Sequence, residues 1–258
     1  MEMVQFVASP SFRARGRRHI ARVEAAGHET AVYFHGLERP LYWPRELPLD
    51  ALYMVAGEQF DHDDWHQYET EETPVRRDDI VVDCGAAEGL FALRVAARCR
   101  RVYAIEPYPR FASAMRRSFE GLENVEIVEC LLGERDGTGK LSGAGLTAME
   151  GTTGADTALR SLDSLFPPGG ADPTYLKADV EGAELRVLRG GRELIRRSRP
   201  RIAFTTYHDA THADEIAHLL KEIEPGYRIR TKGWSQFGTP LMLHAWIEDT
   251  IPRRRRHG

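Results

Sequence analysis

The stretch from Ile80 to Phe91 limits the possible folds of this chain more than any other. β-Branched residues lead to Asp83, a loop of small residues with two glycines follows, and apolar residues then recur at helical spacing. This pattern predicts a buried parallel strand, a tight turn and the start of a helix. Because glycine has no Cβ and the first turn of a helix has free N–H groups, a ligand can approach this backbone closely.

The spacing of the loop disfavours a dinucleotide. The dinucleotide-binding fingerprint, G-x-G-x-x-G, needs three glycines, whereas in this loop Asp83 is followed only by Gly85 and Gly89. A carboxylate at the strand end would repel a pyrophosphate but suits S-adenosylmethionine, which carries a sulfonium and an amino group and no phosphate. We expect the cofactor to contact Asp83, Gly85, Ala86, Ala87, Glu88 and Gly89; the alternative is a turn with only a structural purpose.

Two further predicted strands extend this cofactor site. Residues 101–105 form a short apolar run that ends at Glu106 and Pro107, and an acid at that place can accept hydrogen bonds from ribose hydroxyls. Residues 125–132 are predicted to form the third strand, which would bring Cys130 and Leu131 to an adenine as apolar or backbone contacts.

Composition narrows the class of protein. With 258 residues and 42% hydrophobic content the chain suits one sizeable domain, alone or with an N-terminal extension. A net charge of −4 gives no general nucleic-acid or membrane signal, and no apolar run is long enough to span a membrane. Three cysteines, without framework spacing, indicate free thiols. We therefore expect a cytoplasmic protein without a nucleic-acid or membrane partner.

The N-terminal part is predicted to cover the catalytic part. A helix is expected within residues 11–26, an extended segment at 41–44, and a helix over 49–60 with Asp50 as its N-cap and Met54 inward. Residues 61–68 read as a lid in which Trp65, His66 and Tyr68 line the pocket, or as a polar loop. This gives an extension over 1–71, a catalytic domain over 72–250 and a disordered basic tail over 251–258.

The second half repeats the arrangement of strand, acid, glycine and helix. Residues 175–178 precede Asp179, Glu181 and Glu184, which would repel one another unless something binds there. The fifth strand, 203–209, contains Tyr207 and His208 near its end. Helices are expected at about 185–195 and 211–223, and a terminal hairpin would add one antiparallel strand. Residues 133–157 suggest a weakly specified hairpin or mobile loop, and 159–165 an edge strand.

These stretches resemble the FkbM family of S-adenosylmethionine-dependent methyltransferases. The match lies in residues 82–89, 104–107 and, most specifically, 176–190, with Tyr207 and His208 similar to one branch. The resemblance implies a Rossmann-like class I methyltransferase fold, an α/β fold with a seven-stranded sheet whose last strand is antiparallel. It also implies O-methylation of a hydroxyl of a sugar, glycoconjugate or other small natural product. Many members carry Asn at Ala87 and an apolar residue at Glu88, so here we expect Glu88 to hold the cofactor's amino group.

A hydroxyl is a poor nucleophile, so a base or a metal is expected. His208 is the candidate base, with a structural histidine as the alternative. Asp179 would orient it, bind the substrate hydroxyl, or ligate a divalent cation with Glu181 or His208. Tyr207 and Glu181 are expected on the substrate side. Two rivals remain open: a nucleotide-dependent oxidoreductase, and a non-catalytic binding or scaffold protein of the same fold.

Overall fold

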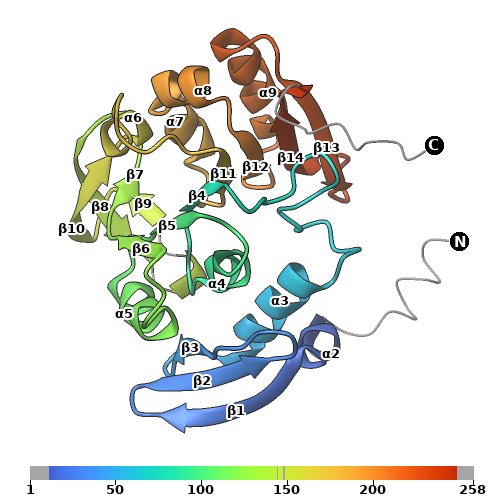
Figure 1. Cartoon of the computed structure of the whole chain (residues 1–258), viewed down its shortest axis with the longest axis vertical. Coiled ribbons are helices and arrows are strands. Elements are labelled where there is room, and N and C mark those ends of the chain that lie inside the picture. The colour runs from blue at the N-terminus through green and yellow to red at the C-terminus, as the bar shows by residue number, and fades with distance from the viewer. Residues whose placement is uncertain (1–11, 144, 148, 249–258) are drawn as a thin grey trace, which may run out of the picture.

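A seven-stranded sheet forms the centre of the protein (Figure 1). The computed structural model describes residues 12–143, 145–147 and 149–248. The strand order of the sheet is β13-β14-β12-β11-β4-β5-β6. The parallel core comprises β4 (Ile80–Cys84), β5 (Arg101–Ile105), β6 (Val125–Val128), β11 (Tyr175–Ala178) and β12 (Arg201–Thr205). β14 (Pro240–Trp246) is antiparallel to both of its neighbours, β12 and β13 (Arg228–Trp234). The predicted fold class is therefore confirmed, whereas the basic tail over 251–258 lies outside the described residues.

Both faces of the sheet are buried. Consecutive strand residues point to opposite faces, and accordingly Val81 packs into one hydrophobic cluster and Val82 into the other. One cluster contains residues of α4 (Leu90–Ala96) and α5 (Pro109–Ser118). The other contains residues of α7 (Glu184–Arg189), α8 (Arg192–Ser198) and α9 (His212–Ile223). This double burial explains why the strand sequences read as continuous apolar runs.

The N-terminal part is a small sheet with two helices. It contains α2 (Phe12–Arg17), β1 (Ile20–Ala26), β2 (Glu29–Phe34), β3 (Leu41–Pro44) and α3 (Leu49–Phe60). β3 rests on α5, where Trp43 lies 5.9 Å from Phe111 between ring centroids and the Tyr42 N–H donates to Ser118 Oγ at 2.8 Å. The N-terminal sheet therefore shares its core with one face of the central sheet.

Several predicted elements in the N-terminal part are wrong in detail. The helix expected within 11–26 ends at Arg17, because Gly27, with φ +73°, forms the turn that pairs β1 with β2. The helix over 49–60 has the predicted bounds, but Pro48 occupies the N-cap position and no side chain caps it, so Asp50 lies in the first turn. Met54 is 40% exposed instead of inward.

The segment after β6 forms a third sheet. It contains β7 (Leu131–Leu132), β8 (Gly137–Ser142), β9 (Met149–Gly151) and β10 (Ala155–Arg160), in the order β7-β10-β8-β9, and a 3-10 helix at Gly145–Thr147. The single strand predicted over 125–132 is thus two strands in different sheets. The edge strand predicted over 159–165 ends at Arg160, because Ser161 caps α6 (Leu162–Leu165) by accepting from Ser164 N–H.

Two smaller predictions, on one helix and on the cysteines, have different outcomes. The helix predicted over about 185–195 is two helices, α7 and α8, which the Gly190–Gly191 pair separates. All three cysteines are free thiols, as expected. None of the helices in the described part of the chain has both the length and the apolar character of a membrane span.

Candidate active site

One cavity opens where the carboxyl ends of the parallel strands meet. Its empty volume is about 1070 Å³, part of it open to solvent. The loops after β4, β5, β11 and β12 form its floor, and α3 and the segment after it form one wall. Gly145, Leu146, Met149 and Glu150 contribute to another. In open α/β sheets this edge is where ligands bind.

The loop after β4 brings its backbone close to the next strand's loop. The N–H groups of Gly85 and Ala86 both donate to the Ile105 carbonyl at 3.0 Å. Gly85 has φ +72°, and a Cβ there would lie 1.9 Å from the Asp179 carbonyl oxygen. Only glycine satisfies both conditions. Ala87 also has a left-handed conformation, with φ 48°, which an alanine adopts at a cost.

Two buried carboxylates line the same end of the cavity. Glu106 accepts the N–H of Ala87 on one oxygen and the N–H of Tyr108 on the other, each at 2.8 Å. Glu88 is buried and accepts the N–H of Leu90 at 3.3 Å. Burial raises the pKa of Glu88 and of Glu106 to about 7, although backbone N–H groups lower both. These acids are therefore poised to ionise when a cationic or hydroxyl-bearing ligand arrives.

A buried lysine neutralises Asp83, the acid of β4. Lys177 Nζ lies 2.9 Å from Asp83 Oδ1 and donates to the Gly85 carbonyl at 2.6 Å. Burial raises the pKa of Asp83, and Lys177 opposes that rise. Burial lowers the pKa of Lys177, but Asp83 and Asp179 raise it more. No role for Lys177 was predicted from the sequence. A lysine is rarely buried without a partner, so its place inside a buried strand, two residues before an acid, could have indicated an ion pair.

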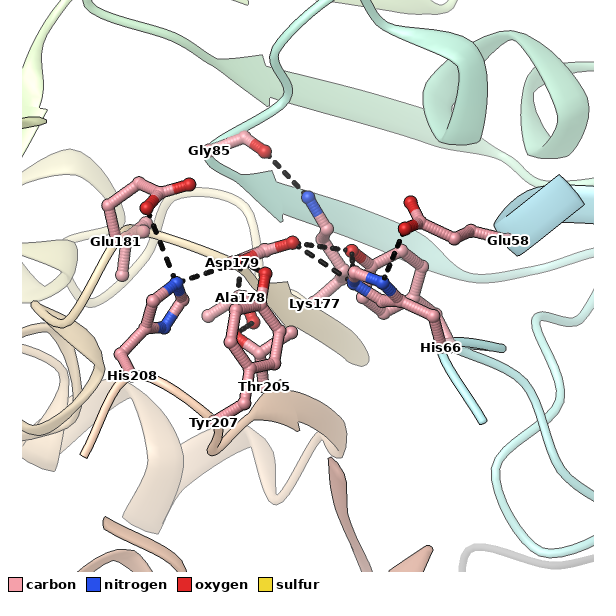
Figure 2. A network of polar contacts seen from close by, with 12 residues as sticks. Glu58, His66, Gly85, Lys177, Ala178, Asp179, Glu181, Thr205, Tyr207 and His208 are labelled. Atoms are coloured by element: carbon pink, nitrogen blue, oxygen red, sulfur yellow. Dashed lines mark hydrogen bonds and ion pairs between the residues drawn. The ribbon is translucent and has the colours of Figure 1, made fainter. Parts of the chain in front are cut away.

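Asp179 is the polar centre of the site (Figure 2). Its Oδ2 accepts from Tyr68 Oη at 2.9 Å and lies 3.2 Å from His66 Nε2. Its Oδ1 accepts from Thr205 Oγ1 and Tyr207 Oη, each at 3.1 Å. These four contacts use the acceptor sites of the carboxylate, so an acceptor hydroxyl that binds here takes the place of one donor. Burial raises the pKa of Asp179, but His66 and Lys177 lower it far more, so the carboxylate stays ionised. Four side chains from two segments distant in sequence, residues 66–68 and 205–207, thus converge on one anion.

The predicted lid segment contributes to this centre. His66 lies between Asp179 and Glu58 of α3, with 3.5 Å between His66 Nδ1 and Glu58 Oε1. Burial lowers the pKa of His66, yet its bonds to Asp179 and Glu58 raise it to about 9. Behind the segment, Arg15 pairs with Asp61 at 2.8 Å and with Asp64 at 3.0 Å, which ties it to α2.

His208 is surrounded by carboxylates. Its Nε2 lies 3.4 Å from Glu181 Oε2 and 3.9 Å from Asp179 Oδ1, while its Nδ1 lies 3.1 Å from Glu184 Oε1. Burial lowers the pKa of His208, but Glu181 and Glu184 raise it to about 10. The imidazole is therefore protonated at neutral pH until another cation joins the cluster.

Most of the residues predicted from the sequence lie together in the wall of this cavity. They are Gly85, Ala86, Ala87, Glu88, Glu106, Pro107, Cys130, Leu131, His66, Tyr68, Asp179, Glu181 and Tyr207. Asp83, Gly89, Trp65 and His208 are not part of the wall. Asp83 is enclosed with Lys177, and Trp65 stacks on His66 with 4.7 Å between ring centroids. The wall also contains Glu58, Met149 and Glu150, which had no predicted role.

The sheet topology and the cavity together define the class. A seven-stranded sheet with β14 antiparallel in it, a glycine turn after β4 and an acid after β5 are the features of class I S-adenosylmethionine-dependent methyltransferases. The sequence model of the methyltransferase FkbM domain matches residues 83–229, which is more than half of the chain. This protein belongs to the FkbM methyltransferase family, so the oxidoreductase and scaffold alternatives are set aside.

One solved structure agrees with this fold. The crystal structure of the methyltransferase FkbM from Methylobacillus flagellatus KT is similar, with a TM-score of 0.56 and 19% identity over 77% of this chain and 52% of that one. This chain thus spans about half the length of that protein. Aeropyrum pernix fibrillarin with bound S-adenosyl-L-methionine (TM-score 0.44, 14% identity, 88% and 99% coverage) and an rRNA methylase from Streptococcus thermophilus (0.44, 13%, 67% and 89%) are weaker matches. No protein of curated function matches the sequence.

Proposed function

We propose that this protein transfers the methyl group of S-adenosylmethionine to a hydroxyl of a sugar, glycoconjugate or other small natural product. One observation supports this most: a single cavity joins the Glu88 and Glu106 end, suited to an adenosyl cofactor, to the Asp179 centre, suited to a hydroxyl. When bound, the cofactor supplies a methyl group already activated by a sulfonium. The protein's task is then to align the nucleophile and to manage one proton.

The residues at the first end fit the cofactor. Glu106 has both oxygens fixed by backbone N–H groups, and its remaining lone pairs suit ribose hydroxyls. Glu88, nearer the glycine turn, suits the amino group. Cys130 and Leu131 are buried beside the cavity and provide apolar contacts for an adenine. Asp83 acts indirectly, because its ion pair with Lys177 fixes the carbonyl of Gly85.

The residues at the second end fit an acceptor hydroxyl. Asp179 is held ionised by fixed donors, so it accepts a hydrogen bond from the hydroxyl and orients it toward the methyl group. As the oxygen–carbon bond forms and the carbon–sulfur bond breaks, the hydroxyl proton must leave. His208 beside Asp179 stays the predicted base, but Glu181 and Glu184 raise its pKa to about 10, so it accepts this proton only after its own proton has been released. Tyr207, which is 37% exposed, offers an aromatic face on which a sugar ring can pack.

The charge of the cavity favours a neutral or cationic small molecule over a nucleic acid. Its wall includes Glu58, Glu150, Asp179 and Glu181 around the acceptor end, and such a field repels phosphates. The segment 61–68 and α3 would act as the lid, and the extension over 1–71 would select the acceptor. Three free cysteines support a reducing, cytoplasmic location.

The test is turnover with a panel of glycosides and hydroxylated natural products, detected as release of S-adenosylhomocysteine. Asp179→Asn should lower kcat by about 10²-fold or more, because the fixed anion is lost. His208→Ala should lower kcat with little change in cofactor affinity. Full turnover of His208→Ala would refute the base assignment, and turnover of RNA in preference to every small acceptor would refute the substrate class.

A further inference from the structure

We propose that Asp179, Glu184 and His208 form a binding site for a first-row divalent cation such as Mn²⁺, at the acceptor end of the cavity. Binding of the cation does not depend on the proposed function, whereas its role in the reaction rests on it. The set differs from the one predicted from the sequence, because Glu184 takes the place of Glu181.

The three side chains already have the spacing of a ligand set. One ligand atom from each lies within 4.8 Å of the others. Atoms bound to one cation at about 2.0–2.3 Å are at most about 4.6 Å apart, so small side-chain movements suffice. Asp179 follows β11, Glu184 begins α7 and His208 follows β12. The ends of two neighbouring parallel strands and the first residue of α7 therefore bring these side chains together.

Buried polar atoms at this place lack partners. Glu184 is 0% exposed, and its Oε2 makes no hydrogen bond. It lies 3.5 Å from Nδ1 of the buried His212, which also makes no hydrogen bond. Both ring nitrogens of His208 are buried without one. Buried polar atoms in native proteins are nearly always satisfied. Glu184 Oε1, which faces His208, already accepts from Val180 N–H at 3.1 Å and from Thr205 Oγ1 at 3.2 Å. A cation bound by a ring nitrogen of His208 and, after the carboxylate turns, by Glu184 Oε2 would give both of these atoms a partner.

The chemistry of the set indicates the kind of cation. Two carboxylates and one imidazole suit Mn²⁺, Fe²⁺ or Zn²⁺ better than Ca²⁺, which prefers all-oxygen sites. Three protein ligands leave coordination positions open. Asp179 lies in the cavity wall, so an open position can face the acceptor. If the proposed function holds, the cation binds the acceptor hydroxyl and lowers its pKa.

The direct test is a titration of the metal-free wild type with Mn²⁺, followed by electron paramagnetic resonance and without cofactor. We expect one site, and Glu184→Gln should weaken it about tenfold or more. The matched control is Glu222→Gln, because Glu222 pairs with His218 at 3.4 Å on the exposed side of α9 without a third ligand. Glu222→Gln should bind as the wild type does. The absence of a site in the wild type at millimolar Mn²⁺, or unchanged binding by Glu184→Gln, would overturn the proposal.

A second measurement uses only the wild type, so it does not depend on how the variant folds. Electron spin echo modulation of bound Mn²⁺ should show a directly coordinated nitrogen, from His208. A spectrum without nitrogen coupling would overturn the site. Calorimetry with S-adenosylmethionine in the presence of a chelator tests the proposed function separately: cofactor binding together with no Mn²⁺ site would refute this inference alone.

Discussion

Removing the charge of Lys177 should destabilise the protein in a way that depends on pH. In Lys177→Met the side chain keeps its length, but the ammonium that faces Asp83 at 2.9 Å is lost. Both carboxylate oxygens of Asp83 are buried and make no hydrogen bond. The variant therefore leaves an uncompensated charge in the core, which typically costs about 3–5 kcal/mol.

Protonation of Asp83 limits this cost. Keeping an aspartate neutral costs about 1.4 kcal/mol for each pH unit above its ordinary pKa of about 3.9. The loss of stability in the variant therefore cannot exceed about 4 kcal/mol at pH 7 or about 1.5 kcal/mol at pH 5. The sign follows from the raised pKa: a buried acid without its partner is tolerated at low pH, and stability is lost as pH rises toward its folded pKa. At about 2–4 °C per kcal/mol, Tm should fall by roughly 8–16 °C at pH 7.

The assay is urea and thermal unfolding of the variant at pH 5 and pH 7. The double variant Asp83→Asn with Lys177→Met should recover most of the loss, because it removes both charges. Lys221→Met, at an exposed lysine, should stay within about 0.5 kcal/mol of the wild type. A loss below about 1 kcal/mol at pH 7, a loss equal at both pH values, or no recovery in the double variant would refute the reasoning.

Two further predictions concern the cofactor end. Gly85→Ala should prevent cofactor binding or unfold the protein, because its Cβ would lie 1.9 Å from the Asp179 carbonyl oxygen. The control is Gly137→Ala, where nothing lies within 4 Å of the added Cβ, so both the cofactor affinity and Tm should stay nearly unchanged. Equal Tm values for the two variants would contradict the argument. Affinity for S-adenosylmethionine should rise between about pH 6 and pH 8, with proton release on binding, because the pKa values of Glu88 and Glu106 are raised to about 7 and the ligand favours their ionised forms. Calorimetry in two buffers of different ionisation enthalpy measures that proton, and proton uptake would show that the sign is wrong.

The parts of the fold that follow local patterns could be predicted from the sequence. The strand from Ile80 and the helix over 49–60 have strong periodicity and clear ends, and both have nearly their predicted bounds. The hairpin of β1 with β2 was missed, because the alanines, arginine and glutamate of Ile20–Ala26 are strong helix formers. Of the sheet from β7 to β10, only a hairpin within 133–157, as one of two alternatives, and a misplaced edge strand were predicted. Its strands are short and weakly apolar, so long-range pairing decides their structure.

The residues of the candidate site likewise divide into those that local sequence patterns predict and those whose place depends on packing. Acids that end a strand, such as Glu106 and Asp179, could be located because parallel strands end at one edge. Glu58 could not, since its place beside His66 depends on how α3 packs on the catalytic part. Glu181 and Glu184 were both visible as acids, and both contact His208, but only the carboxylate of Glu184 is fully buried, which depends on the turn at Val180–Ala183.

The most direct test of the central claim is calorimetric titration of the wild type and of Glu106→Gln with S-adenosylmethionine, S-adenosylhomocysteine and NAD. The wild type should bind both adenosyl ligands and not NAD. Glu106→Gln should bind them at least about tenfold more weakly, because hydrogen bonds to a charged acceptor are worth about 1.5–3 kcal/mol each. Glu123→Gln, an exposed control, should bind as the wild type does. Binding of NAD alone, or undiminished adenosyl binding by a folded Glu106→Gln, would contradict the cofactor site described here.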